Sequence, residues 1–201
     1  PIMRPKVADI LHAGLSSLSF CLALVATEAC ADGSFFQTDL SETTSGATVS
    51  IGRGPLTYGG SAVKYDGGYA LGLSATYKLP LRSDLVTVRV GPSLGTAHDD
   101  KKSGAIDLGV KVVVERYMPM KFGSLYLLAD LNSIDQSWFV LSQIGFAQPG
   151  VAIELSHGVS TTYAETSIAI AKRLTGSPVS LRVGYSFDSS AVFAGISINT
   201  F

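Results

Sequence analysis

The stretch Tyr69-Ala70-Leu71-Gly72-Leu73-Ser74-Ala75-Thr76-Tyr77-Lys78-Leu79 decides the fold class of this chain. Every odd position carries an apolar or aromatic side chain, and every even position carries a small or polar one. A period of two residues places the two sets on opposite faces of a β-strand. The segment therefore predicts a strand with one apolar face and one small, polar face.

The same alternation continues through most of the chain, with turns rich in Gly, Pro, Asn, Asp and Ser between the runs. A hairpin over residues 125–131 and 138–146 is less regular, because apolar residues occupy both of its faces. We expect an all-β, antiparallel, up-and-down barrel of ten strands, or of eight if that hairpin folds differently. The expected strands are residues 48–52, 69–79, 84–94, 105–117, 125–131, 138–146, 151–156, 163–174, 179–187 and 192–199.

The first 31 residues have the features of a secretory signal peptide. Arg4 and Lys6 form a short basic region, and residues 15–26 form an apolar stretch too short to span a bilayer as a helix. The Ala-Cys-Ala sequence ending at Ala31 has the small residues that signal peptidase requires. We expect cleavage there, followed by a polar lead-in over residues 32–45 and a barrel domain over residues 46–201.

Composition excludes several classes of protein. The 201 residues are 46% hydrophobic and only 15% charged, too apolar for a disordered chain. The 15 basic and 16 acidic residues leave no positive excess for nucleic acid. No run after residue 31 approaches the ~18 apolar residues of a membrane-spanning helix. Both cysteines, Cys21 and Cys30, lie in the expected signal, so the mature chain is expected to contain no disulfide.

The polar face of the expected strands is mostly Gly, Ala, Ser and Thr, with isolated charges that balance. The charged residues on it are Lys78, Arg89, Lys111, Arg173 and Arg182, with Asp107, Glu115, Asp130, Glu154 and Glu165. Buried ions have to be paired, so a neutral set indicates a closed, salt-bridged interior. A transmembrane barrel would place this face inside and the apolar face toward lipid. The period alone leaves open the reverse arrangement, a soluble barrel with solvated charges outside.

Strand ends and connections favour the membrane arrangement. The connections over residues 54–67 and 95–103 are the longest, and both would lie on the outer side of the membrane. Aromatic residues cluster where strands end, as in the interfacial girdles of membrane barrels, and two basic residues of the apolar face lie there too. These residues are Tyr69, Tyr77, Trp138, Phe146, Tyr185 and Phe187, with Arg116 and Lys172.

The signal, the alternating strands, the short inner turns and the C-terminal Phe201 resemble small Gram-negative outer-membrane β-barrels over residues 46–201. The resemblance implies a porin-like protein of the cell envelope, in contact with lipid of the cell outer membrane. It also implies insertion by the barrel-assembly machinery. No nucleic acid and no particular surface partner are indicated.

Candidates for chemistry are few. His157, Ser160 and Glu165 are the residue types of an acyl-transfer site, and some barrels that resemble this one deacylate lipid A with a His-x-Ser pair. Here Val159 stands two residues after His157, so we expect no enzymatic activity. His98 has no second His or Cys nearby, so we expect no metal and no cofactor.

Four functions remain open, in decreasing order of support. The first is a non-enzymatic outer-membrane barrel that serves envelope structure or surface interaction. The second is a narrow pore for ions or small solutes, which eight or ten strands would leave nearly filled by side chains. The third is a lipid-modifying enzyme centred on His157, and the fourth is a soluble secreted barrel that binds an apolar ligand.

Overall fold

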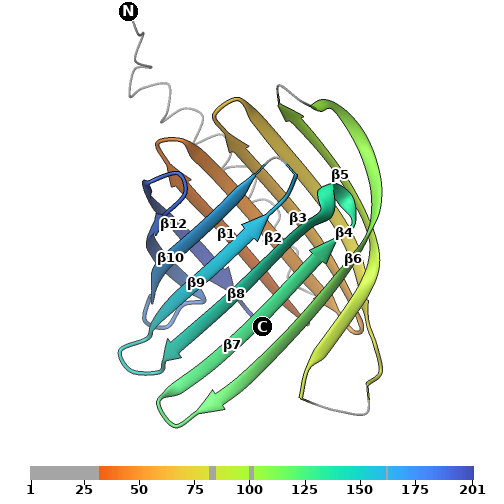
Figure 1. The fold of residues 1–201 in the computed structure, drawn as a ribbon. Helices are drawn as coiled ribbons and strands as arrows, with labels where there is room; N and C mark the ends of the chain where they lie inside the picture. The colour runs from red at the N-terminus through yellow and green to blue at the C-terminus, as the bar shows by residue number, and fades with distance from the viewer. Residues whose placement is uncertain (1–31, 82–84, 100–101, 162) are drawn as a thin grey trace, which may run out of the picture. The chain divides into compact units, whose positions relative to one another are not determined.

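A computed structural model describes residues 32–81, 85–99, 102–161 and 163–201, which form a closed antiparallel barrel of 12 strands (Figure 1). The expected signal peptide lies outside the described residues. Each strand pairs with the next in sequence, and β12 pairs with β1. None of the described residues forms a helix with the length and hydropathy needed to cross a bilayer. The elements are β1 (Gly33–Ser41), β2 (Thr44–Arg53), β3 (Leu56–Tyr65), β4 (Gly68–Lys78), β5 (Thr87–Asp99), β6 (Lys102–Met120), β7 (Gly123–Asn132), the 3₁₀ turn η2 (Ile134–Gln136), β8 (Ser137–Phe146), β9 (Val151–Val159), β10 (Ala164–Arg173), β11 (Val179–Ser186) and β12 (Ala191–Asn199).

The expected number of strands, ten or eight, is wrong. Each expected strand overlaps one in the structure, and the two additional strands are β1 and β3. β1 occupies the supposed lead-in, where Gln37-Thr38-Asp39 puts three polar residues in succession and conceals the alternation. β3 occupies the supposed connection 54–67, where Gly59-Gly60 interrupts it. In the second long connection, residues 95–99 belong to β5 and residues 102–103 belong to β6.

Twelve strands make the barrel wider than the sequence suggested. Following the register once around the sheet returns to β1 displaced by about 14 residues, which for a barrel of circular cross-section corresponds to a strand tilt of about 39° and a backbone radius of about 12 Å. An eight-stranded barrel is just filled by its own side chains. Between the described strands, the longest connection is residues 79–86. The connections between strands are therefore too short to fill the interior, which is lined by the side chains of the strands and, over Gly95 and Gly109, by Ile134 of η2.

The apolar face of the sheet points outward. Leu108 is 82% exposed, Ile106 71% and Val192 65%. On the opposite face, Thr76 and Ser93 are buried. The register links Gly, Ala, Ser and Thr residues from strand to strand over much of the inner face, and on β7 and β8 the inner face also carries Leu128, Phe139 and Leu141. The alternation in the sequence therefore predicted the two faces correctly.

The two ends of the barrel differ in what they carry. The start of β1 and the end of β12 pair with each other and define a terminal rim, and the turns β1–β2, β3–β4, β5–β6, β7–β8, β9–β10 and β11–β12 define the far rim. At the terminal rim, the ring of Phe201 lies over Gly33 and Gly52, where an added Cβ would come within 3 Å of it. The aromatic C-terminus therefore lies on the inner side of the sheet.

Closure through β1 can be tested by cross-linking. Thr38 and Ile196 are opposite one another on β1 and β12, at a separation that suits a disulfide. With Cys21 and Cys30 replaced by Ser, a Thr38→Cys/Ile196→Cys chain should cross-link on mild oxidation, as measured by gel mobility.

The matched control is Val49→Cys/Ile196→Cys. Residues 48–52 would meet the last strand in a ten-stranded barrel, but in the structure β1 lies between them. The control pair should stay reduced. Cross-linking of the control pair in place of the first pair would show that β1 is not part of the barrel.

Candidate functional site

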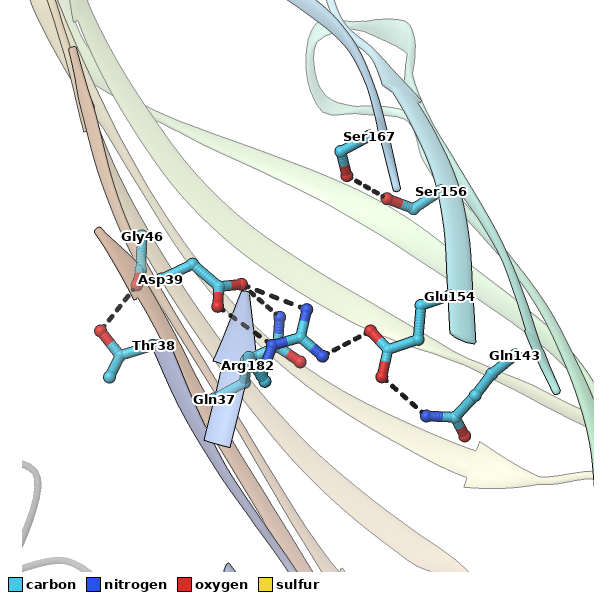
Figure 2. Close-up of polar contacts among 9 residues, drawn as sticks. All are labelled: Gln37, Thr38, Asp39, Gly46, Gln143, Glu154, Ser156, Ser167 and Arg182. Atoms are coloured by element: carbon cyan, nitrogen blue, oxygen red, sulfur yellow. Dashed lines mark hydrogen bonds and ion pairs between the residues drawn. The ribbon is translucent and has the colours of Figure 1, made fainter. Parts of the chain in front are cut away.

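The most buried ionic group of the inner face is the guanidinium of Arg182 on β11. Its side chain is 5% exposed and forms ion pairs with two carboxylates, Asp39 on β1 and Glu154 on β9. The distance from Nε to Asp39 Oδ1 is 3.0 Å. Figure 2 shows the guanidinium between the two acidic side chains. A buried cation of this kind is stable only with such partners, because its desolvation is costly.

Small residues on the intervening strands make these contacts sterically feasible. Gly195 on β12 lies between Arg182 and Asp39, and a Cβ there would lie 2.2 Å from Asp39 Oδ1. Ala169 and Ala171 on β10 are buried between Arg182 and Glu154. The arginine can therefore extend over a neighbouring strand on both sides.

Two amides extend the arrangement. Gln37 Nε2 donates to Asp39 Oδ2 at 2.7 Å, and Gln143 Nε2 donates to Glu154 Oε1 at 2.8 Å. We call these five residues, Gln37, Asp39, Gln143, Glu154 and Arg182, the seam network, because they link β8 and β9 to β1 across the closure of the barrel. The network contains one cation and two carboxylates.

A second group of charges lies on the wall formed by β5, β6 and β7. Arg89 pairs with Glu115, which also accepts a hydrogen bond from the Tyr126 hydroxyl at 2.9 Å. Lys111 Nζ lies 2.7 Å from Asp130 Oδ2. These four charged side chains are 20–24% exposed, so the pairs are partly accessible to water.

The remaining expected charges also face inward but lie nearer the rims. At the terminal rim, Lys78 is opposite Arg89 in the register, and Arg173 Nε donates to the Ser177 carbonyl at 2.9 Å. Asp107 faces inward on β6, opposite Gly95. With Asp39 added, the described strand residues of the inner face carry six carboxylates against five cations, where the sequence indicated five of each.

Glu165 lies near the far rim and organises two turns. Its carboxylate accepts hydrogen bonds from the backbone N–H groups of Asp188 and Ser189, at 3.0 and 3.3 Å. The hydroxyl of Tyr163 donates to Glu165 Oε2 at 3.4 Å. Burial, followed by the charge of Glu165, raises the pKa of Tyr163 to about 12, so this hydroxyl stays protonated at neutral pH.

The three residue types of an acyl-transfer site are not brought together. His157 faces outward, with Nδ1 2.8 Å from Thr166 Oγ1 and its ring 5.1 Å from that of Trp138. Glu165 faces inward on the neighbouring strand, and Ser160 Oγ donates to the Tyr163 carbonyl.

The second described histidine, His98, stacks on Tyr69 at the far rim. The described residues contain no group of three or more His, Cys, Asp or Glu side chains arranged to hold a metal ion.

Sequence reasoning misses Asp39 and its amide partner Gln37, because three successive polar residues conceal the alternation of their strand. The signal that could have found them is the spacing Phe35-x-Gln37-x-Asp39, which alternates in register with the last strand. Recognising that strand would have placed a sixth carboxylate on the inner face.

Removal of the Arg182 guanidinium should destabilise the barrel strongly. Arg182→Met leaves Asp39 and Glu154 without their cation, at an expected cost of about 3–5 kcal/mol. Arg173→Met is the matched control, because that arginine is exposed at the terminal rim, and it should cost about 0.5 kcal/mol or less. The measurement is the urea midpoint of unfolding in detergent, and equal midpoints would exclude a buried role for Arg182.

Comparisons with known proteins give structural matches only. No protein-family model and no curated protein sequence matches the chain. Among solved structures, it is similar to the KdgM porin in complex with disordered oligogalacturonate, with a TM-score of 0.52 and 10% identity over 84% of this chain and 99% of that one. The Acinetobacter baumannii outer membrane protein Omp33 gives a TM-score of 0.48 and 11% identity over 83% and 95%. The likeness to KdgM confirms the expected resemblance at the level of the fold: the chain has the closed antiparallel β-barrel fold of that porin.

Proposed function

We propose that this protein is a narrow pore for small solutes in the cell outer membrane. The observation that carries the proposal is the width of the barrel: twelve strands enclose more space than the eight that side chains fill completely. The inner face is built mainly from Gly, Ala, Ser and Thr, and the connections between the described strands are short. A polar path through the barrel follows from this arrangement.

The outer surface supports a membrane location. Large apolar side chains such as Leu73, Leu108 and Val192 are more than 60% exposed, which in water would be an aggregation hazard. Facing lipid, the same side chains need no cover. We therefore propose outer-membrane lipid as the surrounding partner and the barrel-assembly machinery as the route of insertion, and we set aside a soluble barrel with an apolar interior.

The net charge of the inner face predicts the charge of the solutes that the proposed pore prefers. Six carboxylates against five cations favour a weak preference for cations over anions. KdgM was solved with oligogalacturonate, but in this chain Arg89 and Arg182 are both paired with carboxylates. We therefore do not extend an acidic oligosaccharide to this barrel.

A second candidate is a barrel that serves envelope structure or surface interaction without conducting. The seam network favours it, because these five side chains reach over a large part of one wall. A lipid-modifying enzyme has less support, since His157 and Glu165 lie on opposite faces of the sheet, and we propose no enzymatic activity.

Conductance in planar lipid bilayers tests the pore directly. The folded protein should produce discrete current steps, and in a KCl gradient the reversal potential should indicate a weak preference for K⁺. Ser167→Trp adds a bulky ring to the inner face and should lower the step size. Ile168→Trp, one residue along the same strand but facing outward, should leave it unchanged.

Two outcomes contradict the proposal in different ways. Folded protein without current steps would favour the structural candidate. Equal effects of the two Trp substitutions would show that the current does not pass through the interior.

A further inference from the structure

Two tyrosines from opposite walls meet at the far rim. Tyr65 is the last residue of β3, and Tyr163 directly precedes β10. In the closed order of strands, β3 and β10 are separated by four strands in one direction and by six in the other. The two rings nevertheless stack, with centroids 5.8 Å apart and an interplanar angle of 22°. The stack therefore bridges the interior at its far mouth.

The β9–β10 turn holds Tyr163 in this position. Ser160 N donates to the Tyr163 carbonyl at 2.7 Å, and Tyr163 N donates to Ser160 Oγ at 3.1 Å. Glu165 then accepts the hydrogen bond of the Tyr163 hydroxyl. The turn is also joined to η2, because Thr161 N donates to the Asp135 carbonyl at 3.1 Å. Tyr163 is therefore fixed at both its backbone and its hydroxyl.

The η2 turn also contacts the inner face of the barrel. The side chain of Ile134 lies over two inner-face glycines, where an added Cβ would be 2.6 Å from it at Gly109 and 3.3 Å from it at Gly95. Asp135 and Gln136 have φ of 55° and 46°, in the left-handed region that costs non-glycine residues energy. That conformation is held by the packing of Ile134 and by the contact with Thr161.

On the Tyr65 side of the stack, the hydroxyl group lacks a hydrogen-bond partner within the described part of the chain. The Tyr65 hydroxyl is buried and has no hydrogen-bond partner among the described residues. Gly68 packs against the ring, and an added Cβ there would lie 2.8 Å from Cε2. A buried hydroxyl without a partner makes the stacked arrangement less favourable than it would otherwise be. A polar solute that reaches the mouth can supply the missing partner.

We propose that the Tyr65–Tyr163 stack, held by the hydrogen bonds of Ser160 and Glu165, is a gate that limits access at the far mouth to small polar solutes. The gate rests on the proposed pore function. It is closed when the rings are stacked, and it opens when a solute separates them and pairs with the Tyr65 hydroxyl. Size selection is then set by these two side chains, and the ion pairs deeper in the barrel set the charge preference.

The test compares Tyr65→Ala and Tyr163→Ala with Tyr69→Ala. Tyr69 is the matched control, because it lies at the same rim and stacks on His98, but on the outer face. The proteins are reconstituted in liposomes, and swelling rates are measured with neutral sugars from monosaccharides to tetrasaccharides. Both gate variants should admit the larger sugars several-fold faster than the wild type and should show larger current steps. Tyr69→Ala should match the wild type.

Heat-modifiable migration on gels establishes that each variant is folded before it is tested. If both gate variants have the conductance and the size selection of the wild type, the proposed gate is wrong, but the proposed pore function is not contradicted. Absence of steps in every folded variant would overturn both the gate and the pore.

Discussion

Closure of the sheet between β1 and β12 is the constraint on which the rest of the structure depends. In the membrane location that we propose, a sheet cannot leave an edge of unpaired N–H and C=O groups, because lipid offers them no hydrogen bonds. The first and last strands pair along their length, and the seam network fastens the same place from inside. Arg182 needs two carboxylates to be stable there, and reaching them requires small residues on β10 and β12. The composition of the inner face thus follows in part from the demand for closure.

The width of the closed barrel determines which of the proposed functions are physically possible. With eight or ten strands, ten ionic side chains would fill most of the interior, and a structural role would be the natural conclusion. With twelve, the charges pair along the walls in two groups, one on β5–β7 and one from β8 across to β1. Because twelve strands enclose more volume than the eight that side chains fill, we favour the pore as the proposed function. The tyrosine stack then stands at the mouth, where a small number of residues can control a wider interior.

Sequence periodicity predicted the faces well and the number of strands poorly. Leucine and valine on the outer face alternate with small and polar residues on the inner face in β4, β6 and β11, so the sequence predicts these strands. β1 and β3 were not, because polar side chains in succession or paired glycines remove the alternation without preventing strand pairing. Because β1 was not predicted, Asp39 was not predicted as an inward-facing carboxylate either. The meeting of Tyr65 and Tyr163 depends on which strands oppose each other across the barrel, and that follows only from the number of strands.

The central claim is that the apolar face meets lipid and the small, polar face encloses the interior. Fluorescence quenching at two adjacent positions of β10 tests it most directly, with a fluorophore on Ile168→Cys or on Ser167→Cys in protein reconstituted into bilayers. The label at Ile168 should be quenched by nitroxides on the acyl chains and not by water-soluble iodide, and the label at Ser167 should show the reverse. Acyl-chain quenching at Ser167 with none at Ile168, or at neither position, would contradict the account.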